Sequence, residues 1–151
     1  MIIYRLAIEA FKDDLSGTGS KLFGGRWNFP GRPAIYTSEN ISLAVLEIIA
    51  NANKDNIPPG YCLLKIQVPD NLPFKLIKHS GLKDKWYTDF EYAQFIGSNF
   101  LESGKEAMLK MPSAIVKEEY NFLLNPAHPD FKKIAIKESV PFDVDIRLLK
   151  K

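Results

Sequence analysis

Segments of strand type outnumber helical segments along this chain, and the two types do not alternate strictly. Apolar or alternating runs predict strands over residues 2–8, 34–37, 61–68, 74–77, 107–116, 134–137 and 140–149. Helical spacing of apolar residues is found over residues 41–52 and 89–102. A doubly wound parallel sheet needs a helix between successive strands. The order of segments excludes that fold and predicts an α+β fold.

Three local features refine this prediction. Pro112 interrupts the segment 107–116, and a proline inside a strand is typical of a sheet edge or a bulge. The sequence Pro58-Pro59-Gly60 is expected to end the unit that contains the first helix. Along the second helix, Phe90, Phe95 and Phe100 are expected to supply aromatic contacts.

Residues 16–33 hold five glycines and two prolines, which predicts a long irregular loop between the first two strands. Loops longer than about 12–15 residues are uncommon inside compact domains and are often functional. We therefore expect this segment to face a ligand.

Size and charge limit the class of protein. The chain has 151 residues and 17.1 kDa, which predicts a single domain spanning residues 1–151. Hydrophobic residues make up 46% and charged residues 25%, as in soluble globular proteins. The net charge is only +2, so direct binding of nucleic acid is not expected. The lone Cys62 excludes an internal disulfide and a zinc site made of cysteines.

The N-terminal sequence MIIYRLAIEAF lacks the basic start and cleavage site of a secretory leader. The longest apolar stretch, residues 41–52, is too short to cross a bilayer and contains Glu47. We expect a cytoplasmic protein without membrane contact.

Glu47 is the first candidate for chemistry, because it is the only charged residue between Glu39 and Lys54. Burial of a carboxylate is costly unless the group is paired or hydrogen-bonded. One interpretation is an acid on a partly exposed edge of the helix. The other is an acid held in a cleft with an arginine partner, which is typical of a functional site.

The second candidate is the sequence GGRWN, from Gly24 to Asn28. Paired glycines permit close approaches of the backbone, an arginine offers a planar fork to a phosphate, and Trp27 could cover an aromatic ring. No GKS or GKT follows, and the spacing GxGxxG is absent, so this is neither a Walker loop nor a Rossmann fingerprint. The alternative is a surface turn in which Trp27 packs against the protein.

Other residues carry weaker signals. Arg5, in the first strand, either extends outward to solvent or joins Arg26 at a pyrophosphate. Tyr36 precedes the helix that contains Glu47, where an aromatic ring is most often part of the core. Ser113 follows the proline of a broken strand and is commonly a turn residue.

Four polar residues complete the survey. Asn121 and Asn125, in YNFLLNP, could cap turns or contact a ligand. His79 and His128 are far apart in sequence and show no spacing typical of metal ligands, so no metal is expected. His128, in NPAHPD, is interpreted as a turn residue.

Several motifs occur together, in order, along nearly the whole chain: YRLA from Tyr4, GGRWN, AIYTS, LAVLEII and MPSAIVKEEYNFLLNPAHPD. In this order and approximate spacing the sequence resembles the RES-domain toxins of bacterial toxin–antitoxin pairs, a family named for arginine, glutamate and serine positions. Residues 70–105 match only loosely. The resemblance implies an ADP-ribosyltransferase-like fold with a cleft for NAD, and an Xre-like antitoxin as partner.

The resemblance also implies which residues form the site. Catalytic roles would fall to Glu47, Arg26, Tyr36 and Ser113, and NAD would be bound by Arg5, Arg26, Tyr36, Trp27 and Asn121. Members of this family consume NAD by hydrolysis or phosphorolysis, or transfer ADP-ribose to a protein.

The expected chemistry needs few groups. Nicotinamide in NAD is already a cationic leaving group, so one carboxylate that stabilises the oxocarbenium-like ribose suffices. We expect Glu47 to take this role and Arg26 and Arg5 to bind the pyrophosphate. Tyr36 is expected to stack on or flank nicotinamide. Ser113 is expected to position a ribose or an amide by a hydrogen bond. A protein-modifying transferase, a non-catalytic nucleotide-binding module and an RNA-cleaving toxin using His79 or His128 are the alternatives, the last disfavoured by the small net charge.

Overall fold

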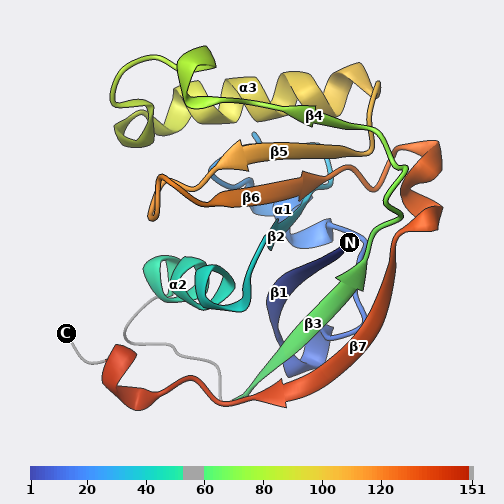
Figure 1. Cartoon of the computed structure of the whole chain (residues 1–151), viewed down its shortest axis with the longest axis vertical. Coiled ribbons are helices and arrows are strands. Elements are labelled where there is room, and N and C mark those ends of the chain that lie inside the picture. The colour runs from blue at the N-terminus through green and yellow to red at the C-terminus, as the bar shows by residue number, and fades with distance from the viewer. Residues whose placement is uncertain (53–59, 150–151) are drawn as a thin grey trace.

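A seven-stranded sheet forms the framework of the computed structural model, which describes residues 1–52 and 60–149 (Figure 1). The strand order is β4-β5-β6-β2-β1-β3-β7, and every neighbouring pair is antiparallel except β4 and β5. The strands are β1 (Ile2–Ile8), β2 (Ile35–Ser38), β3 (Tyr61–Gln67), β4 (Phe74–Leu76), β5 (Met108–Pro112), β6 (Tyr120–Leu124) and β7 (Ala135–Phe142). The α-helices in the described residues are α1 (Thr18–Phe23), α2 (Ile41–Asn51) and α3 (Phe90–Ser103). The predicted α+β fold, with more strands than helices, is confirmed.

The sheet opens between β2 and β1. In the described residues these strands pair only where Tyr4 lies opposite Ser38, whereas β2 and β6 pair along the whole of β2. In Figure 1 the strands β4, β5 and β6 of one half, β4-β5-β6-β2, lie across the view, whereas β3 and β7 of the other half, β1-β3-β7, run obliquely to them. A split between two sheet halves provides space for a ligand without disturbing either core.

Each half of the sheet is covered by its own helix. The helix α2 begins after Asn40, whose side chain accepts a hydrogen bond from the Leu43 backbone N–H at 2.8 Å. Ala44 of α2 packs in a cluster with Leu6 of β1 and Leu63 of β3. The helix α3 buries a different group of side chains against β5 and β6: Ala93, Phe100, Leu101, Leu109, Met111 and Leu123. Among the described residues, none of the helices has the length and apolar character needed to cross a membrane.

Several predictions about single elements were wrong. The segment 16–33 is not irregular throughout, because α1 lies within it. Pro112 ends β5, which lies between β4 and β6 and not at an edge, because the short strand β4 covers its outer side. Of the three phenylalanines expected to pack from the second helix, Phe100 is buried, while Phe90 and Phe95 are exposed to solvent.

The C-terminal half differs from the sequence interpretation in two further ways. The strand β6 occupies the sequence YNFLL, where the sequence pattern predicted no strand. The predicted strands 134–137 and 140–149 form one continuous strand, β7, and a short 3-10 helix at Ile146–Leu148 replaces the end of the second. Of the predicted turn Pro58-Pro59-Gly60, the two prolines lie outside the described residues.

Candidate active site

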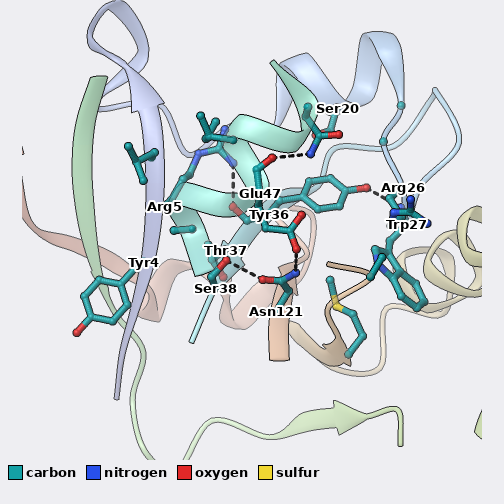
Figure 2. A pocket seen from close by; sticks show the side chains of 18 residues that line it. Tyr4, Arg5, Ser20, Arg26, Trp27, Tyr36, Thr37, Ser38, Glu47 and Asn121 are labelled. Atoms are coloured by element: carbon teal, nitrogen blue, oxygen red, sulfur yellow. Dashed lines mark hydrogen bonds between the residues drawn. The ribbon is translucent and has the colours of Figure 1, made fainter. Parts of the chain in front are cut away.

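A cavity of about 350 Å³ lies where the two halves of the sheet separate (Figure 2). Its walls come from β1, β2, α2, Asn121 of β6 and the segment that follows α1. A volume of this size suits a small-molecule ligand. The predicted site residues that line it are Arg5, Arg26, Trp27, Tyr36, Glu47 and Asn121.

Glu47 projects from α2 into this cavity and is half-buried. Its Oε1 atom accepts a hydrogen bond from the Ser113 hydroxyl at 2.9 Å and another from Asn121 Nδ2 at 2.5 Å. In the part of the chain that the structure describes, Oε2 forms no hydrogen bond. The carboxylate is thus held by one oxygen while the other remains available. Glu47 therefore lies in a cleft, as one interpretation predicted, but its partners are Ser113 and Asn121, and in the described residues no arginine forms a salt bridge with it.

Ser113 is fully buried and lies just after β5. Its Oγ accepts hydrogen bonds from the backbone N–H groups of Ile115 and Val116, at 3.0 and 3.1 Å. With its lone pairs used in this way, the hydroxyl proton points to Glu47. The structure therefore places Ser113 behind the acid, where it contacts Glu47 and does not line the cavity.

Arg5 enters the cavity from β1, so the alternative of an outward-extended side chain is wrong. Its Nη1 donates to the Tyr36 carbonyl at 3.1 Å, but its Nε is buried without a hydrogen-bond partner in the described residues. Burial lowers the pKa of the Arg5 guanidinium, an effect that the nearby Asp14 carboxylate partly opposes. A buried N–H without a partner is costly, and an arginine of this kind is suited to bind an anion.

Arg26 reaches the same cavity from a different wall, so that the two arginines lie on either side of the Glu47 carboxylate in Figure 2. Its Nη1 donates to the Tyr87 carbonyl at 3.2 Å, and its guanidinium carbon lies 5.3 Å from the centre of the Phe90 ring. These contacts fix the side chain and leave further N–H donors for a ligand.

The ring of Tyr36 crosses the cavity between these walls (Figure 2). Its hydroxyl donates to Asn28 Oδ1 at 2.5 Å and accepts from the Trp27 backbone N–H at 2.9 Å. Burial raises the pKa of the phenol, so the hydroxyl stays protonated at neutral pH. Because a Cβ atom on Gly25 would lie 2.6 Å from this hydroxyl oxygen, the second glycine of GGRWN leaves the room that Tyr36 occupies.

Trp27 is mainly a core residue, in agreement with the packed-turn interpretation. Only 2% of its surface is exposed, and its ring lies 5.4 Å from that of Trp86. Its backbone approaches α3 at Gly97 so closely that a Cβ there would lie 1.8 Å from the Trp27 carbonyl oxygen. Gln94 of α3 donates to the Gly25 carbonyl at 3.0 Å. The helix therefore anchors the segment that carries Arg26.

The remaining polar residues lie outside the cavity. Asn125 donates to the Leu101 carbonyl at 3.2 Å, and His128 caps a short 3-10 helix, Pro129–Lys133, as predicted for a turn residue. His79 contacts the Lys117 carbonyl. Within residues 1–52 and 60–149, no group of three or more His, Cys, Asp or Glu side chains could hold a metal ion.

Two members of the network were not assigned to the site by sequence reasoning. Asn28 is completely buried and fixes the Tyr36 hydroxyl; its place in GGRWN was the available signal. Ser38 is buried and donates to Asn121 Oδ1 at 2.6 Å. The sequence does not point to Ser38, because no pattern in one sequence indicates that β2 and β6 are neighbours.

Comparisons with known proteins identify the family of this chain. The family model described as the RES domain matches residues 2–145. The chain is 38% identical to "Toxin Res" of Photorhabdus laumondii, over 99% of this chain and 98% of that protein. It is 37% identical to the "Prs ADP-ribosylating toxin" of a Sphingobium species, over 98% of this chain and 96% of that protein.

A solved structure has a similar fold. The structure is that of the M. tuberculosis MbcT–MbcA toxin–antitoxin complex, with a TM-score of 0.73 and 24% sequence identity, covering 93% of this chain and 83% of the matched chain. The match of the family model over nearly the whole chain and the identity to curated relatives lead to one conclusion: this chain belongs to the RES domain family.

Proposed function

We propose that this protein is the toxin of a bacterial type II toxin–antitoxin pair that depletes NAD⁺ by cleaving the bond between nicotinamide and ribose. The observation that carries the proposal is the cavity itself, in which one carboxylate, Glu47, lies with two arginines, Arg5 and Arg26. The relatives carry the names "Toxin Res" and "Prs ADP-ribosylating toxin", which supports the proposed role as a toxin. In this proposal the protein acts as a single domain of residues 1–151 in the cytoplasm.

The proposed reaction begins with cleavage of the C1′–N bond, whose electron pair goes to the nicotinamide ring. Nicotinamide leaves as a neutral molecule, so no general acid is needed, and positive charge develops on the ribose as in glycoside cleavage. The oxygen of water or phosphate then attacks C1′. Hydrolysis yields ADP-ribose and releases a proton to solvent.

Glu47 is the group suited to this charge. Since Ser113 and Asn121 occupy Oε1, the free Oε2 is the atom proposed to face the ribose. Both neighbours donate hydrogen bonds, an arrangement that suits an ionised carboxylate. Fixed groups of this kind stabilise a transition state without reorganising during the reaction.

The cationic residues are proposed to bind the anionic part of NAD. Arg5 has an unpartnered buried N–H, and Arg26 has donors beyond the one used by Tyr87. Phosphate oxygens are the acceptors that arginine forks fit best. The ring of Tyr36 is proposed to flank nicotinamide, because its hydroxyl is already used by Asn28 and Trp27.

A partner is also part of the proposal. The solved structure of similar fold is of a toxin together with its antitoxin. The resemblance to RES-domain toxins implies an Xre-like protein as the antitoxin of this chain. Co-expression of the gene pair followed by purification through a tag on one partner tests for a stable complex.

Release of nicotinamide from NAD⁺ by the purified, partner-free protein is the test of the proposed function. We expect turnover well above one nicotinamide per protein molecule. Dependence of the rate on phosphate, with ADP-ribose 1″-phosphate as product, would assign phosphorolysis, and no dependence would assign hydrolysis. Stoichiometric binding of NAD⁺ without nicotinamide release would contradict the proposal and support a binding module.

A second candidate is transfer of ADP-ribose to a protein, favoured by the name of the Sphingobium relative. Both reactions share the ribosyl cation and differ only in the acceptor. Incubation with adenine-labelled NAD⁺, with and without cell extract, separates them. Free labelled ADP-ribose supports NAD⁺ depletion, whereas label that is retained on one protein band supports transfer.

A further inference from the structure

The junction of the two sheet halves contains a serine that lines the cavity but gives its hydroxyl proton to another side chain of the protein. Ser38 is the last residue of β2 and lies opposite Tyr4 of β1 and opposite Asn121 of β6. Side chains of directly opposed residues on antiparallel strands lie on the same face of the sheet. Ser38 is 3% exposed and Asn121 is 8% exposed, so their side chains meet away from solvent.

Two short hydrogen bonds run in one direction from this serine to the acid. Ser38 Oγ donates to Asn121 Oδ1 at 2.6 Å, and Asn121 Nδ2 donates to Glu47 Oε1 at 2.5 Å. An ionised carboxylate only accepts, so the NH₂ end of the amide must face Glu47. The carbonyl end then faces Ser38, whose hydroxyl satisfies it. The chemistry at both ends fixes the direction of the amide.

We infer that Ser38 is a positioning residue, which acts through Asn121 to hold the Glu47 carboxylate so that Oε2 faces the reacting ribose. This inference rests on the proposed function. It assigns Asn121 to the support of Glu47, in place of the direct contact with NAD expected from the sequence. The residue at which the two halves of the sheet pair would thus also orient the proposed acid.

Loss of the Ser38 hydroxyl has a specific consequence. The carbonyl oxygen of Asn121 would be left buried without a partner, which is unfavourable, and the amide would turn to satisfy it. Glu47 would then lose one of the two donors that hold Oε1. The arginines and Tyr36 would be unchanged, so the effect should fall on turnover and not on NAD⁺ binding.

The first test compares variants of β2 in the full-length protein. We expect Ser38→Ala to lower kcat by about tenfold to a hundredfold, as for other residues that orient a functional ligand, with the Kd for NAD⁺ changed less than about twofold. Ser38→Thr, which keeps the hydroxyl, should restore most of the turnover. Unchanged kcat in Ser38→Ala would overturn the inference.

Thr37→Val is the matched control, because it removes another buried hydroxyl from the same strand. Thr37 also lines the cavity, but its hydroxyl is bonded to the backbone of β6. Thr37 Oγ1 donates to the Phe122 carbonyl at 3.1 Å and forms no hydrogen bond with Asn121 or Glu47 in the described residues. We expect it to lower the melting temperature with little effect on kcat. If Thr37→Val lowered kcat as much as Ser38→Ala does, the loss would come from destabilising β2 in general. That result would contradict the inference.

A double-mutant cycle tests whether Ser38 acts through Asn121. If it does, adding Ser38→Ala to Asn121→Ala should lower kcat by less than about twofold beyond Asn121→Ala alone, because coupled residues are not additive. Additive losses would overturn the inference. Melting temperatures of all four proteins identify any variant that is not folded.

A measurement without turnover keeps this inference separate from the proposed function. In ¹⁵N–¹H spectra, the Asn121 side-chain NH₂ signals should be protected from solvent exchange in the wild type and lose protection in Ser38→Ala. Absence of nicotinamide release by the wild type would contradict the proposed function. An Asn121 amide that is indifferent to Ser38→Ala would contradict the positioning role, whatever the activity.

Discussion

The acidic and the cationic groups of the cavity are held in different ways. Glu47 Oε1 is held by Ser113 and Asn121, and these in turn are held by backbone N–H groups and by Ser38. Arg5, by contrast, keeps a buried N–H without a partner in the described residues. The protein itself fixes the orientation of the acid, whereas the arginines keep donors that no protein group uses.

The acid and the arginines are thus suited to two different tasks, stabilising a transition state and binding an anion. A group that stabilises a transition state must already be oriented, because reorganisation during the reaction reduces its effect. A group that binds an anion needs free donors, which destabilise the empty protein and are satisfied when the ligand arrives. We therefore expect changes at Glu47 and its hydrogen-bond partners to affect turnover, and changes at the two arginines to affect affinity.

Glu47→Gln should have the largest effect. The amide keeps the size of the side chain but removes the charge that stabilises the ribosyl cation. We expect kcat to fall by about a hundredfold or more, with the Kd for NAD⁺ nearly unchanged. Nicotinamide release and calorimetric titration measure the two quantities.

Glu102→Gln provides the control for that variant, because Glu102 is an exposed acid on α3 whose carboxylate lies 3.6 Å from Arg32. It should behave as the wild type. Turnover by Glu47→Gln within a few-fold of the wild type would remove the catalytic role assigned to this residue.

Arg26→Ala should weaken NAD⁺ binding by about tenfold or more, the usual effect of losing hydrogen bonds to a charged partner. The effect on kcat should be smaller. The matched control is Arg32→Ala, which removes an arginine that does not line the cavity. A titration in which Arg26→Ala and the wild type have the same Kd would contradict the assignment of Arg26 to the phosphates.

Arg5→Met separates stability from binding most clearly. The substitution replaces a buried, incompletely paired cation by an apolar side chain of similar length, which is often neutral or stabilising. We expect the melting temperature of the ligand-free protein to stay equal or rise, while the affinity for NAD⁺ falls by about tenfold. A lower melting temperature combined with unchanged affinity would assign Arg5 to the fold and not to the ligand.

Of these variants, Tyr36→Phe should have the smallest effect on nicotinamide release. It should, however, change how the free energy of unfolding depends on pH. Burial raises the pKa of Tyr36 above its ordinary value of 10.0, so the unfolded chain loses this proton at a lower pH than the folded protein. The contribution of Tyr36 to the free energy of unfolding is therefore fully present below pH 10 and is lost as the pH rises above it. Urea unfolding between pH 8 and 11 should show a shallower fall in Tyr36→Phe than in the wild type.

The same fall should remain in part after the substitution, because burial also raises the pKa of Tyr61. Identical slopes for Tyr36→Phe and the wild type would contradict the buried, hydrogen-bonded state of the Tyr36 hydroxyl. A slope that becomes steeper would have the wrong sign for this account.

Local patterns predicted much of the fold. The apolar runs of β1 and β3 and the apolar spacing along α2 are properties of short stretches, so one sequence reveals them. The split between β1 and β2 is a property of strand order. Since pairings between distant strands are not encoded locally, the neighbours β2 and β6 could not be inferred.

The site residues also divide into those that a local pattern reveals and those whose role depends on distant partners. Glu47 was visible because it is the isolated charge of an apolar helix, and Arg26 because it lies beside paired glycines. Ser38 and Asn28 are ordinary polar residues whose importance comes from partners 83 and 8 positions away. Ser113 was found through the family resemblance, but its contact with Glu47 depends on how β5 and α2 come together.

A crystal structure of Glu47→Gln with NAD⁺ bound would show how the ligand lies in the cavity, because the inactive variant should retain the intact dinucleotide. We expect C1′ of the nicotinamide ribose to lie against the side chain of residue 47 and phosphate oxygens to lie on Arg5 or Arg26. A dinucleotide bound with its adenine end at residue 47, or outside the cavity altogether, would contradict this expectation.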